Sequence, residues 1–67
     1  MRIFEKVRMY IDSEGINQIA VAEKAGFSAS EFYAILNGER TMYAEDLQRI
    51  CWALNVNPEL FFEPESA

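Results

Sequence analysis

The sequence contains no histidine, and Cys51 is its one cysteine among 67 residues. Without histidine, the His-containing zinc clusters and the His-dependent catalytic triads cannot form, and a single cysteine makes no internal disulfide. The three glycines are scattered, so no glycine-rich loop for phosphate binding is present. These absences predict no cofactor, no metal site, no catalytic residue and no small-molecule substrate, and we do not expect an enzyme.

Long apolar runs and an excess of basic residues are also missing. No segment approaches the roughly 18 consecutive apolar residues of a membrane span, and the amphipathic start after Arg2 lacks the pattern of a signal peptide. We therefore expect a cytoplasmic protein without a membrane partner, in agreement with its free cysteine. Six Lys and Arg against 11 Asp and Glu give a net charge of −5, which argues against non-specific binding of nucleic acid.

What the sequence does contain is apolar residues at helical spacing, with a hydrophobic fraction of 51% that suffices for a small core. Residues 3–11 predict a first helix, which Gly15 ends because glycine readily adopts the left-handed conformation. Asn17 is a suitable N-cap for a second helix. Gly26 ends this second helix after about two turns.

Two further helices follow. Ser28 and Glu31 have the spacing of a capping box, in which each residue caps a backbone amide of the other, and they predict the start of a third helix. Asn37 and Gly38 terminate that helix. Apolar residues at spacings of three, four and seven predict a fourth helix over residues 44–54.

The end of the chain predicts one more short helix. Asn57 is an N-cap and Pro58 occupies the first helical position after it. The sequence thus predicts an all-α, compact five-helix domain over residues 1–62, followed by a polar tail over residues 63–67 that contains a second proline.

The second and third helices together have the pattern of a helix-turn-helix. Ala22 is the small residue that lets two helices cross closely, and Gly26 tolerates the positive φ that the turn needs. The apolar residues expected on the inner faces are Val21, Ala25, Phe27, Phe32 and Ile35.

In residues 18–28 and 35–40, the sequence resembles the lambda-repressor/Cro-like (Xre-type) helix-turn-helix family, and residues 47–61 are similar to that family's fourth and fifth helices. The resemblance covers residues 3–62. It implies sequence-specific binding of double-stranded DNA by a transcriptional regulator, either a compact repressor or a phage-related protein. It also implies a homodimer on a palindromic operator, with the third helix in the major groove.

The resemblance further implies a set of DNA-contacting residues. They are Gln18, Ala29, Ser30, Tyr33, Ala34, Asn37, Gly38 and Arg40. Gln18, at the start of the second helix, would hold one phosphate. Asn37 and Gly38 would present an amide and backbone N–H groups to a second phosphate, with the charge of Arg40 just beyond.

The positions that would face base edges depart from the family pattern. Family members commonly place Gln, Arg or Asn there, whereas this sequence has Ala29, Ser30 and Ala34, with Tyr33 beside them. Bidentate pairing to a base contributes about 1–3 kcal/mol of discrimination, and none of these side chains can make it. We therefore expect weaker direct readout, with more reliance on DNA shape and water.

Several side chains allow two interpretations. Glu31 is a helix cap or a reader of cytosine, and Cys51 is a packed thiol or a redox sensor. Trp52 covers the first helix or belongs to a partner surface. Of Phe61 and Phe62, one packs inward and the other is a dimer contact, so the fifth helix is the predicted dimer interface.

The roles of the basic residues of the first helix and of Asn37 also have two interpretations. Arg2, Lys6 and Arg8 form a solvated helix face or flank DNA. Asn37 is either only the last residue of its helix or a phosphate contact.

The charge distribution leaves two functions open. Residues 1–40 contain five basic and six acidic residues, whereas residues 41–67 contain one basic and five acidic residues. Most of the negative charge thus belongs to the part that the family places away from DNA, so the acidity does not exclude a DNA-binding regulator. The alternative is a helix-turn-helix used for protein interaction, as an antirepressor, adaptor or oligomerisation module, which the acidity and the plain recognition helix favour.

Overall fold

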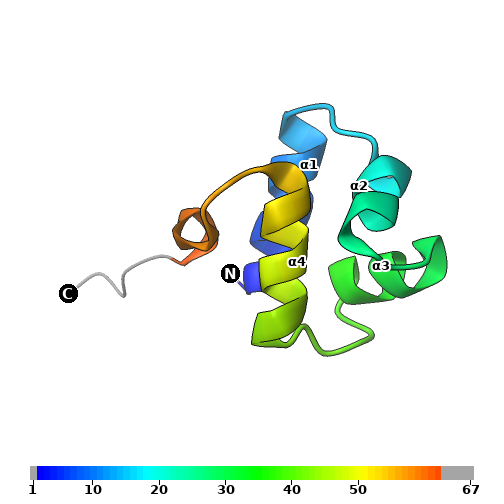
Figure 1. Ribbon diagram of the computed structural model, residues 1–67. Coiled ribbons are helices and arrows are strands. Elements are labelled where there is room, and N and C mark those ends of the chain that lie inside the picture. The colour runs from blue at the N-terminus through cyan, green and yellow to red at the C-terminus, as the bar shows by residue number, and fades with distance from the viewer. Residues whose placement is uncertain (1, 63–67) are drawn as a thin grey trace.

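The computed structural model describes residues 2–62, which contain four α-helices and one 3-10 helix (Figure 1). They are α1 (Ile3–Ser13), α2 (Gln18–Ala25), α3 (Ala29–Leu36), α4 (Ala44–Leu54) and η1 (Pro58–Phe61). No strand occurs among these residues, which confirms the all-α prediction. The tail predicted over residues 63–67 lies outside the described residues.

The prediction of five α-helices is wrong at the last element, because η1 is a 3-10 helix of four residues. Asn57 caps it as predicted, accepting a hydrogen bond from the Glu59 N–H at 2.9 Å. The N–H groups of Leu60 and Phe62 donate to carbonyls three residues earlier, and Phe62 is already extended. The segment therefore stops before an α-helical hydrogen bond can form.

The predicted helix ends are confirmed at the second and third helices. The Asn17 side chain accepts from the Ala20 N–H at 3.1 Å, and Gly26 ends α2 with a φ of 88°. Ser28 and Glu31 each accept a backbone hydrogen bond from the other at 3.1 Å. Glu31 is therefore a helix cap, and its side chain and that of Ser28 each satisfy one backbone amide that the start of α3 would otherwise leave unpaired.

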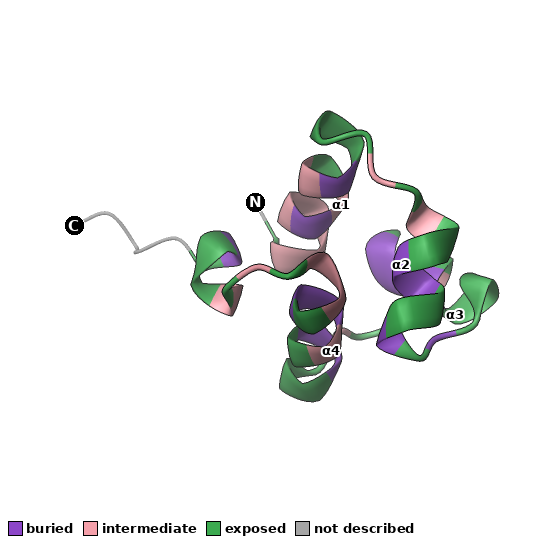
Figure 2. Ribbon diagram, turned by 45° about the horizontal axis from the view of Figure 1, so that its top comes forward, coloured by how far each residue is buried: buried purple, intermediate pink, exposed green. Residues whose placement is uncertain are grey.

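The core lies between the helices, with α2 packed against α4 and α1 against α3. Figure 2 shows the buried residues on the facing sides of these helices. The largest fully buried side chains include Phe32, Phe61 and Ile11. Cys51 is also buried, and burial raises the pKa of its thiol, so the packed-thiol interpretation fits its surroundings. Within residues 2–62, the helices are too short or too polar to span a bilayer.

The structure gives definite positions to two aromatic side chains, Phe61 and Trp52, for which the sequence allowed two interpretations. Phe61 is only 2% exposed and packs edge-on against Tyr10, with ring centroids 5.7 Å apart. It is therefore a core residue of a single copy and is not available as a dimer contact, whereas Phe62 is exposed. Trp52 does not cover the first helix, because its ring lies under Lys24 of α2 and is 66% exposed.

Candidate nucleic-acid interface

The helix-turn-helix is built around the left-handed turn at Gly26. Ala22 is buried where α2 packs against its neighbours, and its carbonyl accepts a hydrogen bond from the Phe27 N–H at 2.8 Å. Phe27 is buried beyond the turn and stacks on Phe32 of α3, with ring centroids 6.1 Å apart. The turn and Phe32, the first buried residue of α3, thus fix the angle between the two helices.

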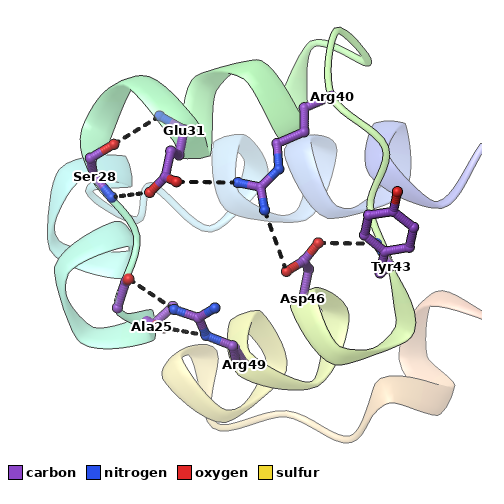
Figure 3. Close-up of polar contacts among 8 residues, drawn as sticks. Ala25, Ser28, Glu31, Arg40, Tyr43, Asp46 and Arg49 are labelled. Carbon is purple, nitrogen blue, oxygen red and sulfur yellow. Dashed lines mark hydrogen bonds and ion pairs between the residues drawn. The ribbon is translucent and has the colours of Figure 1, made fainter.

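Arg49 of α4 braces this turn from outside the motif (Figure 3). Its Nε donates to the Ala25 carbonyl at 2.9 Å and its Nη2 donates to the Gly26 carbonyl at 2.8 Å. Its guanidinium lies 4.1 Å from the centre of the Phe27 ring. Arg49 therefore caps the end of α2 and stacks on the turn at the same time.

This role of Arg49 is not predicted by the sequence. The available signal was a basic residue one position before the buried Ile50 on a helix that otherwise carries acidic charge. This pattern does not indicate which groups Arg49 contacts, because the two carbonyls that accept its hydrogen bonds are more than 20 residues away in the chain.

The outer side of α3 carries the residues predicted to face base edges. Ala29, Ser30 and Tyr33 are exposed, and Ala34 is partly buried. The helix thus presents one hydroxyl, one phenol and otherwise small apolar groups. None of these side chains carries a charge, so the surface can contact bases without contributing to counterion release.

Arg40 lies between two carboxylates rather than alone at the edge of the site (Figure 3). Its Nη1 is 3.6 Å from Glu31 Oε2, and its Nη2 is 4.0 Å from Asp46 Oδ1. The second carboxylate is buried and also accepts a hydrogen bond from the Tyr43 N–H at 3.1 Å, at the start of α4. One guanidinium therefore links the caps of α3 and α4, and any phosphate contact by Arg40 competes with both carboxylates.

The electrostatics of Glu31 agree with this arrangement. The Ser28 N–H that donates to its carboxylate lowers the pKa of Glu31 below the ordinary value, and the Ser28 hydroxyl and Arg40 act in the same direction. The carboxylate of Glu31 is therefore protonated at a lower pH than that of an ordinary glutamate. Its charge stands one position after Ser30, where it would repel a nearby phosphate.

The end of α3, where a phosphate site is predicted, contacts Arg8 of α1. Arg8 Nη1 lies 3.4 Å from Asn37 Oδ1 and 3.5 Å from the Leu36 carbonyl, at the limit of hydrogen bonding. The N–H of Gly38 donates to the Ile35 carbonyl at 3.2 Å. The Gly38 backbone donor predicted for phosphate is therefore already engaged within the chain, whereas Asn37 is exposed.

Gln18, the remaining predicted contact, is the first residue of α2 and is partly buried. It follows the Asn17 cap directly. Its position at the helix N-terminus agrees with the predicted placement, and the cap already satisfies the Ala20 N–H of this turn.

Gly38 lies in the loop between α3 and α4, and its substitution tests what stabilises that loop. Its φ is 78°, and a Cβ there would lie 2.6 Å from Cζ of Phe4. We expect Gly38→Ala to lower the free energy of unfolding, measured by urea denaturation, by about 2–3 kcal/mol, of which about 1–2 kcal/mol is the left-handed cost and the rest comes from displacing the ring. Gly15→Ala is the matched control, because Gly15 has a φ of 66° and open space around it. Equal losses in the two variants would contradict the contact with Phe4.

Comparison with known protein families matches residues 6–65 to a family described as a Cro/C1-type HTH DNA-binding domain. Comparisons with curated proteins and with solved structures gave no match.

Proposed function

The chain belongs to the Cro/C1-type helix-turn-helix DNA-binding family, and from this premise we propose that it is a transcriptional regulator that binds double-stranded DNA sequence-specifically. In this proposal α3 enters the major groove and Ser30 and Tyr33 contact base edges. The observation that carries it is the braced turn between α2 and α3, which leaves the outer side of α3 exposed. We infer a repressor, because a domain bound at an operator that overlaps a promoter blocks that promoter by occupancy alone.

The direct readout in this proposal is weak. Ala29 and Ala34 can contact only a thymine methyl or leave room for water, and Ser30 accepts more than one base. Shape of the operator and pairing of two half-sites supply the remaining specificity.

A selection from genomic DNA fragments, followed by binding measurements across salt concentrations, tests the proposal. We expect log K to fall linearly with log salt, with a slope of about −0.9 for each phosphate neutralised. Ser30→Ala should change the preference at one base pair, whereas Gln18→Ala should weaken binding to all sequences about equally. An unchanged preference profile for Ser30→Ala would place the recognition surface elsewhere.

The second candidate is a protein-interaction module on the same fold. The observation that favours it is the pairing of Arg40 with Glu31 and Asp46, which offsets positive charge beside α3. If the folded protein binds no fragment at low salt, the DNA proposal is wrong and this candidate replaces it.

A further inference from the structure

The outer side of α4 carries the most exposed large hydrophobic side chain of the described residues, Trp52. Glu45 and Gln48 are exposed on the same side of the helix, seven and four positions earlier. The opposite side of α4 is buried, as the purple parts of this helix in Figure 2 show. Trp52 therefore does not contribute to the core of a single copy.

Lys24 of α2 completes this surface. Its Nζ lies 5.5 Å from the centre of the Trp52 ring, where the cation is attracted to the ring face. A shallow depression beside the ring is lined by Lys24, Ala25, Glu45, Gln48, Arg49 and Trp52. The Arg49 guanidinium is engaged with the carbonyls of Ala25 and Gly26, which leaves Lys24, Glu45, Gln48 and Trp52 as the side chains that a partner can contact. We call these four residues the Trp52 face.

The Trp52 face has opposite charges at its two ends. Lys24 and Trp52 lie at one end, and Glu45 lies about 10 Å away along α4 at the other, as the helical rise gives for seven residues. A two-fold axis near Gln48, with the two α4 helices antiparallel, brings Glu45 of each copy to the Lys24 and Trp52 of the other. A surface that matches itself in this way meets the requirement of an isologous interface.

We propose that the Trp52 face binds a second copy of this chain, and that this contact is the dimer interface of the regulator. The proposal rests on the proposed function in one respect, since a palindromic operator needs a dimer. None of the four residues belongs to the set predicted to contact DNA, so α3 keeps its exposed surface.

The groove beside Phe62 is the other apolar candidate, and its charges argue against it. The groove has a volume of about 590 Å³. Its lining includes Phe4, Tyr43 and Phe62 together with Arg2 and Arg40, and it contains no carboxylate. Arg40 already pairs with Glu31 and Asp46, so this groove offers a second copy neither a free carboxylate nor an unpaired match for its own charges. The Trp52 face is the one that supplies both signs.

Four residues on each copy are far fewer than the about 20–30 residues a side of a stable interface, so the free dimer is weak. Two adjacent half-sites on DNA raise the effective concentration of the copies and favour the dimer there. This agrees with the limited direct readout of α3.

Sedimentation of the full chain without DNA, over a wide range of concentration, tests the proposal. We expect a monomer–dimer equilibrium that Trp52→Ala weakens at least about tenfold, because buried tryptophans dominate interfaces. Lys24→Glu and Glu45→Lys should each weaken it about tenfold, and the double variant should recover most of the loss. The chain has one tryptophan, so its emission should also shift to shorter wavelength as the dimer forms.

Phe62→Ser is the matched control, since it removes an exposed aromatic side chain outside the Trp52 face. A dimer that Phe62→Ser weakens and Trp52→Ala leaves intact overturns the proposal, as does a wild-type chain that stays monomeric throughout. Dimerisation without DNA binding would leave the interface standing and contradict only the proposed function. Circular dichroism of every variant checks that the helices are retained.

Discussion

Phe61→Ala is expected to lower the free energy of unfolding by about 3–5 kcal/mol, the usual cost of truncating a buried phenylalanine. The side chain is almost fully buried and joins η1 to α1 through its edge-on contact with Tyr10. Lys6 Nζ lies 3.4 Å from the Phe61 carbonyl, so the backbone is also tied to α1. Because so small a core rarely supplies more than about 3–5 kcal/mol, the variant should be largely unfolded in urea-free buffer.

Phe62→Ala is the control for this loss. Its side chain is 49% exposed, so the free energy of unfolding should change by less than about 1 kcal/mol. Urea denaturation followed by circular dichroism at the helical bands measures both variants. A stable Phe61→Ala protein would contradict the burial of this ring and restore it as a candidate for the dimer contact.

The helix ends were predictable because they depend on neighbouring residues. Asn17 caps an amide three residues away, and Ser28 and Glu31 cap each other across the same distance. Gly26 and Asn55 adopt the left-handed conformation at the ends of α2 and α4, as their residue types predict. Local rules of this kind settle where a helix starts and stops without knowledge of the rest of the chain.

The destinations of the long and aromatic side chains were not predictable in the same way. Periodicity indicates that one of two adjacent phenylalanines packs inward, and only the path of the chain after α4 decides that it is Phe61. Trp52 lies one position after the buried Cys51. Its ring makes a cation–π contact with Lys24 of the neighbouring α2 and does not cover α1.

In the candidate site, too, some features follow from neighbouring residues and others depend on distant parts of the chain. The exposed positions of α3 follow from the spacing of its buried residues, so Ala29, Ser30 and Tyr33 lie on the predicted side. The surroundings of Arg40 depend on a carboxylate six residues later, at the start of another helix, whose burial the sequence does not reveal. Electrostatics at a helix junction are therefore the part of the site that needs the structure.

Arg49→Met is expected to lower the free energy of unfolding by about 2–4 kcal/mol. The substitution keeps the aliphatic part of the side chain and removes two charge-assisted hydrogen bonds to the carbonyls of Ala25 and Gly26. It also removes the guanidinium stacked on Phe27. Since both carbonyls belong to the turn between α2 and α3, the affinity for DNA should fall together with the stability.

Arg49→Lys separates charge from geometry at this position. Lysine keeps the positive charge but lacks the planar fork that reaches two carbonyls at once, so it should recover less than half of the stability lost in Arg49→Met. Urea denaturation of the three proteins gives the stabilities, and amide hydrogen exchange of Phe27, whose N–H donates to the Ala22 carbonyl, reports on the turn itself. Full recovery by lysine would mean that a positive charge at the end of α2 is enough to stabilise the turn. The two hydrogen bonds of the guanidinium would then contribute nothing more.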